Sequence, residues 1–142
     1  MRLEAVELEA VGTFADRVVV RDFSPGLNVL AGPNERGKST WLKALLTLFL
    51  EGHRAKKQAV EELRPYGGGA PRIACRFALG EAVWRVEKQY LAAAKAELAK
   101  VSGADRHVGA DAETELARLL EEAGGLAARL PMFWVRQGDT AT

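Results

Sequence analysis

The stretch of sequence that decides the fold is Gly32-Pro33-Asn34-Glu35-Arg36-Gly37-Lys38-Ser39. It matches the phosphate-loop pattern G-x-x-x-x-G-K-[ST] at every fixed position. The two glycines let the backbone curl so that its N–H groups point at phosphate oxygens, while Lys38 would reach the β and γ phosphates. Ser39 would offer its hydroxyl to Mg²⁺. The alternative, an ordinary glycine-bearing turn between a strand and a helix, explains the full match less well.

The residues on either side supply the context that this motif requires. Leu27–Ala31 is a short apolar run that predicts a buried strand, and a helix is predicted from Lys38 to about Leu50. This helix has almost no polar face, so we expect it to be buried on most sides. A strand, a glycine-bearing loop and an apolar helix in this order indicate an α/β phosphate-binding unit.

Other patterns predict an antiparallel portion and a second helix. Strands are expected at residues 3–9 and Arg17–Asp22, as one hairpin, and at Arg72–Leu79 and Ala82–Tyr90, as a second hairpin turning at Gly80-Glu81. Residues 91–101 are rich in Ala and Lys, and their pattern fits a helix or a strand. A further helix is predicted over Asp111–Ala123, with Asp111 as its N-cap.

Composition limits the kind of protein further. The chain has 142 residues, a formal net charge of +1 and 48% hydrophobic residues, which suits about one globular domain and excludes a strongly basic nucleic-acid wrap. Its single cysteine, Cys75, excludes an internal disulfide framework and predicts a reducing, cytoplasmic setting. We expect Cys75 to be a core thiol, and we expect no membrane association because no apolar run approaches about 20 residues.

The residues that would complete a hydrolytic site are not evident. Such a site needs an apolar strand that ends in an acid to hold Mg²⁺ and orient water. Asp22 follows an apolar run, but that run precedes the phosphate loop and belongs to the expected hairpin, so we reject it. The sequence therefore predicts phosphate binding without its catalytic acids, and negligible hydrolysis by these residues alone.

The segment Pro25–Thr40 resembles the phosphate loop of ABC-type ATPase heads from DNA-repair and chromosome proteins. That group includes the structural-maintenance-of-chromosomes (SMC) proteins, RecF, RecN and SbcC-type ATPases, and Glu35 is closer to the YhaN-like branch. The opening residues 1–14 resemble the first strand and turn of these heads, and residues 133–139 are similar to their Q-loop. The resemblance implies an α/β P-loop NTPase fold, with an antiparallel hairpin portion and a mixed sheet around the phosphate-loop helix.

The resemblance also implies roles for individual residues. ATP would be bound by residues of the loop, namely Gly32, Asn34, Glu35, Arg36, Gly37, Lys38, Ser39 and Thr40. Lys38 and Gln137 would be the catalytic residues, and Ser39 and Gln137 would approach Mg²⁺. A simple turn after a buried strand remains the alternative interpretation of Gln137.

The resemblance further implies that residues 1–142 are the N-terminal lobe of a head, with the phosphate loop at 32–40 and the Q-loop near 137. The serine-glycine-glycine signature motif, the acidic strand and the coiled coil of the family are not found in the sequence. Expected partners are therefore a complementary C-terminal half, a second head in an ATP-dependent dimer, DNA and a nuclease subunit. Two other functions stay open: a nucleotide-binding subunit of an ABC transporter, and an assembly module that binds ATP without hydrolysing it.

Two other groups of polar residues, the histidines and a basic cluster, are expected to have no role in binding or catalysis. His53 and His107 are expected to be surface or loop histidines, because no metal-ligand spacing accompanies them. A modest basic cluster, Arg54, Lys56, Lys57 and Arg64, is interpreted as a solvated face rather than a contact for DNA phosphates.

Overall fold

The structure, a computed structural model, describes residues 2–12, 16–21, 35–64 and 69–122. In chain order its elements are β1 (Arg2–Glu9), β2 (Val18–Arg21), α1 (Glu35–Leu50), α2 (Gln58–Glu61), β3 (Arg72–Leu79), β4 (Ala82–Gln89), β5 (Lys95–Lys100), β6 (Arg106–Val108) and α3 (Ala110–Glu122). In the part of the chain that the structure describes, no helix has the length and apolar character needed to cross a membrane.

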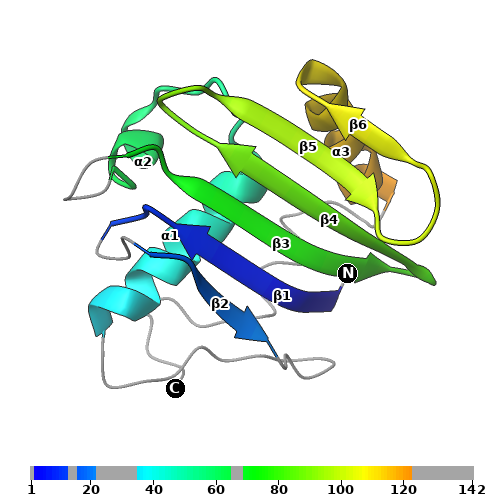
Figure 1. Cartoon of the computed structure of the whole chain (residues 1–142), viewed down its shortest axis with the longest axis horizontal. Helices are drawn as coiled ribbons and strands as arrows, with labels where there is room; N and C mark the ends of the chain where they lie inside the picture. The colour runs from blue at the N-terminus through cyan, green and yellow to red at the C-terminus, as the bar shows by residue number, and fades with distance from the viewer. Residues whose placement is uncertain (1, 13–15, 22–34, 65–68, 123–142) are drawn as a thin grey trace.

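The strands form one sheet with the order β2-β1-β3-β4-β5-β6, shown in Figure 1. Each neighbouring pair among these described strands is antiparallel. The expected α/β class with an antiparallel portion is therefore confirmed. The apolar strand predicted at residues 27–31, which would make the sheet mixed, lies outside the described residues.

Both predicted hairpins are present. β1 pairs with β2 from Ala5↔Arg21 to Leu8↔Val18, and β3 pairs with β4 through Leu79↔Ala82. Gly80 takes a φ of 61° in the short turn between β3 and β4, a conformation that glycine adopts without steric cost. The hairpins were predictable because alternating apolar residues and a turn glycine act over a few neighbouring residues.

The ambiguous segment at residues 91–101 contains β5, and the structure adds β6, which the sequence pattern did not predict. Leu91 and Ala93 have positive φ values of 71° and 49°, which no helix contains, so the segment leaves β4 through an irregular turn. Its side chains then alternate, with Ala96 and Leu98 buried. Pairing with β4 decides the strand conformation, since the local composition suits a helix as well.

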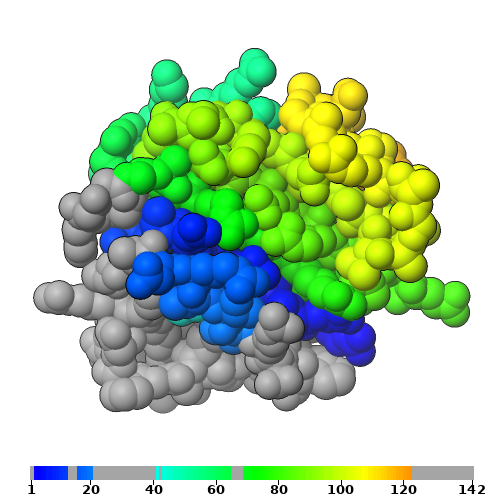
Figure 2. Space-filling view, in the orientation of Figure 1, coloured from blue at the N-terminus to red at the C-terminus, as the bar shows by residue number. Residues whose placement is uncertain are grey.

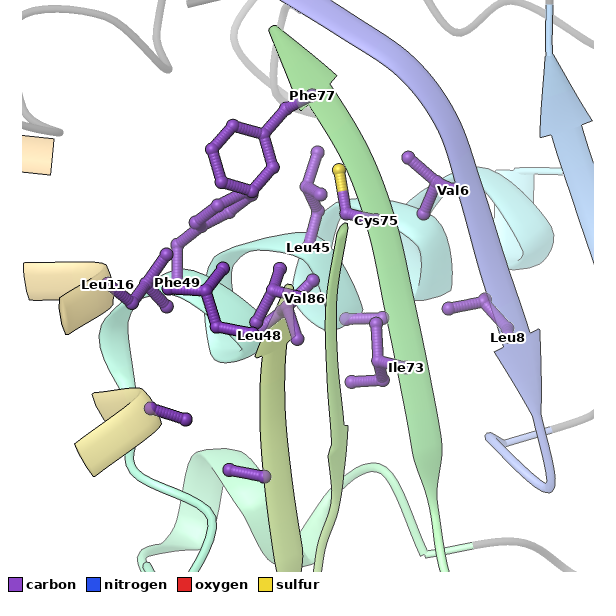
Figure 3. Packing of buried hydrophobic residues seen from close by; sticks show 14 of the residues in the cluster. Val6, Leu8, Leu45, Leu48, Phe49, Ile73, Cys75, Phe77, Val86 and Leu116 are labelled. Carbon is purple, nitrogen blue, oxygen red and sulfur yellow. The ribbon is translucent and has the colours of Figure 1, made fainter. Parts of the chain in front are cut away.

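The two longer helices lie on one face of the sheet, behind the strands in Figure 1. α1 contacts β1 and β3, whereas α3 contacts β5 and β6. Figure 3 shows the core between the helices and the sheet, where Leu45, Leu48 and Phe49 of α1 pack against residues of the strands. Phe49 and Phe77 meet edge to face with ring centroids 5.6 Å apart. Cys75 is a buried core thiol, as predicted, and burial raises its pKa.

The beginning of α3 differs from the prediction. The helix starts at Ala110, so Asp111 lies in its first turn and is not the N-cap. Gly109 precedes the helix with a φ of 60°, and its carbonyl accepts hydrogen bonds from the N–H groups of Ala112 and Glu113. A positive φ favours glycine at this position, while an acidic side chain one residue into the helix still suits its positive end.

Candidate functional site

The second half of the phosphate-loop motif lies on a helix. α1 begins at Glu35, three residues before the predicted start at Lys38, so Gly37, Lys38, Ser39 and Thr40 occupy its first turns. The first N–H groups of a helix have no partner within it, and its dipole makes this end positive. Such an end is suited to binding an anion, which is the chemistry that the motif predicts. Gly32, Asn34 and Gln137 lie outside the described residues.

The opposite half of α1 is anchored in the core. Ala44, Leu45 and Leu48 are buried, and Phe49 packs edge to face on Phe77 of β3. The hydroxyl of Thr47 donates to the Lys43 carbonyl at 2.7 Å, which satisfies this buried polar group within the helix. The sheet thus fixes the helix whose first turns carry Lys38 and Ser39.

The C-terminal end of α1 is held by two side chains from the sheet. Tyr90, fully buried just after β4, has its hydroxyl 3.0 Å from the Thr47 carbonyl and 3.1 Å from the Glu51 carbonyl. Lys88 of β4 donates from Nζ to the same Glu51 carbonyl at 3.0 Å. The last carbonyls of a helix lack partners within it, and a cation there suits the negative end of the dipole.

Glu113 of α3 joins this end of α1 to the loop that follows it. Its Oε1 accepts from Lys88 Nζ at 2.6 Å, and its Oε2 lies 2.8 Å from His53 Nδ1 and 2.5 Å from the His53 backbone nitrogen. His53 lies in a loop, as predicted, and it is buried there, with only 5% of its surface exposed. We call His53, Lys88, Tyr90 and Glu113 the polar clamp.

Burial and pairing act together on the titrating groups of the polar clamp. Burial lowers the pKa of Lys88, and the neighbouring Glu113 carboxylate opposes this effect. Burial alone would raise the pKa of Glu113, but its bonds to Lys88 and His53 outweigh burial, so the pKa lies below its usual value. Burial also raises the pKa of Tyr90, which keeps the hydroxyl a donor. Lys88 and Glu113 therefore form a buried ion pair that is tied by further hydrogen bonds to Glu51 and His53.

The polar clamp was not predicted from the sequence. Its members come from the loop after α1, from β4 and its end, and from α3, so no local spacing connects them. One signal was present, since Lys88 occupies the same face of its strand as Val86 and Tyr90. A lysine in the buried register of a strand is rare unless it is paired.

The other face of the sheet carries a network of ion pairs. Figure 2 shows this face, where no described helix covers β3, β4 and β5. The carboxylate of Glu7 lies 2.8 Å from the guanidinium of Arg17 and 3.3 Å from that of Arg85. The guanidinium of Arg72 lies 2.6 Å from Glu9 and 2.9 Å from Glu87 of β4. Arginines on this face are thus largely neutralised by carboxylates, which gives a polar surface rather than a strongly basic one.

The basic cluster after α1 is solvated. Arg54, Lys56, Lys57 and Arg64 are all exposed. Lys57 lies 3.5 Å from a Glu51 carboxylate oxygen, and Arg64 lies 2.8 Å from the carboxylate of Glu61. This arrangement agrees with the interpretation of the cluster as a solvated face.

The motif is also where the described residues could bind a metal ion. Within residues 2–12, 16–21, 35–64 and 69–122, no three His, Cys, Asp or Glu side chains are grouped so that they could hold one. A serine hydroxyl on the first turns of α1 fits Mg²⁺, which takes one or two protein oxygens and completes its shell with phosphate oxygens and water. The donor set therefore suits a metal that arrives with a nucleotide.

Comparison with known proteins gives three findings. Residues 1–61 match the family model AAA_27, described as an AAA domain. A search of the curated proteins found no match. Among solved structures, the SMC head domain from Thermotoga maritima is similar at 19% identity and a TM-score of 0.45, over 72% of this chain. The chain spans 38% of the length of that head domain.

The family match covers the first hairpin, the phosphate-loop motif and all of α1. It thus includes every described residue to which the motif assigns nucleotide contacts. Together with the start of α1 inside the motif, it supports an ATPase-like nucleotide-binding module. The chain is similar over residues 1–61 to the AAA domain family, which agrees with the nucleotide-binding loop predicted there.

Proposed function

We propose that the chain is the nucleotide-binding lobe of an ATPase head of the SMC or SbcC type. The observation that carries the proposal is the position of α1, which begins within the motif and is anchored at its other end by the core and the polar clamp. A motif of this kind is informative where a helix begins within it, and α1 begins inside the motif, at Glu35, and carries Lys38 and Ser39 in its first turns.

Within this proposal, the motif residues bind ATP together with Mg²⁺. Lys38 neutralises the β and γ phosphates, Ser39 supplies a hydroxyl to the metal, and the remaining loop residues from Gly32 to Thr40 offer backbone N–H groups. Gln137 would sense the γ phosphate from the Q-loop. Mg²⁺, when bound, would supply charge neutralisation between the phosphates.

The proposal extends to the assembly of the working enzyme. A complementary C-terminal half would bring the catalytic acid, and two heads would associate on ATP and separate after hydrolysis. We propose that the assembled heads bind DNA and that a nuclease subunit is a further partner. The single cysteine favours a reducing compartment such as the cytoplasm.

Isothermal titration calorimetry with ATP and Mg²⁺ tests the proposal. Lys38→Ala should weaken ATP binding by at least about tenfold, because a charge-assisted bond to phosphate contributes about 1.5–3 kcal/mol. Lys43→Ala is the matched control, since Lys43 stands on the same helix, is exposed and lies 3.6 Å from Glu62. Circular dichroism should be unchanged for both variants. Equal ATP affinity in Lys38→Ala and the unmodified chain would refute the proposal.

A further inference from the structure

A pocket of about 410 Å³ opens beside the polar clamp, away from the phosphate-loop motif. Its polar lining comes from the loop after α1 and from strands β4, β5 and β6, and consists of His53, Arg54, Glu87, Lys95, Glu97 and Arg106. Pockets that hold small ligands span about 300–1,000 Å³, so this one has the size of a small-molecule site.

The charges around the pocket leave an excess of free cations. Glu87 lies 2.9 Å from Arg72 and 2.9 Å from Arg85, so its charge is offset within the sheet. Glu97 is likewise paired with Arg106, at 2.6 Å.

The remaining two cations of the pocket, Arg54 and Lys95, have no ion pair among the described residues. Both side chains are exposed, so they are free to turn toward an anion in the pocket. The pocket therefore presents two available positive charges against carboxylates that are already neutralised.

His53 is a buried residue with one ring nitrogen that no described residue contacts by a hydrogen bond. Its residue is only 5% exposed, and its Nδ1 is committed to Glu113 at 2.8 Å. The other ring nitrogen, Nε2, has no hydrogen-bond partner among the described residues, yet none of their fully enclosed side-chain nitrogens or oxygens is left unpaired. Nε2 is therefore not fully enclosed, and His53 is among the residues that line the pocket.

The beginning of α3 contributes to the same wall. Gly109, the residue before the helix, lines the pocket, and a side chain there would meet no atom within 4 Å. The first turn of the 13-residue helix α3 is thus close to the pocket, and its positive end is offset by the acidic side chains of Asp111 and Glu113.

We propose that this pocket binds a phosphate-type oxyanion carried by a small molecule, held by Arg54 and Lys95 beside the buried His53. A small ligand is favoured over a nucleic-acid backbone because the neighbouring arginines of the sheet are paired with carboxylates. A backbone needs a row of available cations, which the described part of this face does not offer.

Nuclear magnetic resonance of the full 142-residue chain tests this site, because the sequence has two histidines. Inorganic phosphate and phenyl phosphate are titrated at constant pH and ionic strength while the imidazole signals are followed. The His53 signals should shift saturably with either probe, whereas those of His107, which does not line the pocket, should not. The shift should persist in Lys38→Ala, which removes the main phosphate cation of the motif.

Variants then assign the binding to the pocket. Arg54→Gln with Lys95→Gln should raise the apparent Kd by at least about tenfold, because two charge-assisted bonds are lost. Lys56→Gln with Lys57→Gln, exposed cations of the same loop outside the pocket, should leave it unchanged. The proposal is overturned by the absence of a saturable His53 shift, by loss of that shift in Lys38→Ala, by unchanged binding in the pocket variant, or by a response to duplex DNA alone.

Discussion

Replacing Glu113 with Gln should destabilise the chain more than any other single charge removal on α3. The substitution takes away the carboxylate that accepts from Lys88 Nζ at 2.6 Å and from His53 Nδ1 at 2.8 Å. The Lys88 side chain is 2% exposed, so its ammonium would remain buried without its counter-ion. An uncompensated buried charge is among the most costly consequences of a point mutation.

The size of the effect depends on the burial of the two partners. Removing one partner of a buried ion pair costs about 3–5 kcal/mol. The Glu113 side chain is 23% exposed and Lys88 keeps its bond to the Glu51 carbonyl, so we expect a smaller loss. Because water partly screens the exposed side of this pair, the free energy of unfolding of Glu113→Gln should fall by about 2–3 kcal/mol. For a urea slope of about 2 kcal/mol per molar, the unfolding midpoint should fall by about 1–1.5 M.

Urea unfolding followed by tryptophan fluorescence measures this change, since Trp84 is buried in the core. Glu122→Gln is the matched control on the same helix, because its carboxylate is 63% exposed, and its midpoint should stay within error. The double variant Lys88→Met with Glu113→Gln should recover much of the loss, because an apolar replacement of a buried pair is often neutral. A wild-type midpoint for Glu113→Gln, or a double variant as unstable as the single one, would refute the reasoning.

Three further outcomes are expected. Tyr90→Phe removes the hydroxyl that donates to the carbonyls at the end of α1. The free energy of unfolding, measured in the same urea titration, should fall by about 1–2 kcal/mol. An unchanged midpoint would show that this hydrogen bond does not stabilise the chain. Cys75 is 1% exposed and burial raises its pKa, so a thiol reagent should label it only as fast as the chain unfolds, and rapid labelling of the native chain would contradict its burial. The pKa of Glu113 lies below its usual 4.5, so its stabilisation is complete above that value and is lost as the pH falls through the lower folded pKa. The difference in unfolding free energy between wild type and Glu113→Gln should therefore shrink on acidification, and a difference that stays constant between about pH 6 and about pH 3 would contradict this.

Much of the fold was predictable because its signals are local. The alternation over Arg72–Leu79 matches β3 residue for residue, and the pattern over Asp111–Ala123 predicted α3 to within one residue at each end. The apolar helix after the motif was also predicted, although α1 begins earlier, at Glu35. Each of these patterns depends on spacing within one element, which a single sequence displays directly.

The candidate site was predictable only in part. The phosphate-loop motif can be recognised because its chemistry requires glycine, lysine and serine at fixed spacing, and α1 begins within it, at Glu35. The predicted contacts of Gly32, Asn34 and Gln137 stay predictions, since these residues lie outside the described part. The pocket beside His53 had no signature, because its lining comes from separate strands and a loop.

The linear sequence was sufficient to predict a phosphate loop and to indicate the alternation of the strands, since both patterns depend on neighbours along the chain. The three-dimensional packing decided that residues 95–100 form β5, because β4 supplies the hydrogen bonds that a lone strand lacks. It also decided that Lys88 and His53 are buried. A charged or polar side chain leaves water only where partners are already positioned, and those partners, above all Glu113, come from elements that are distant in sequence.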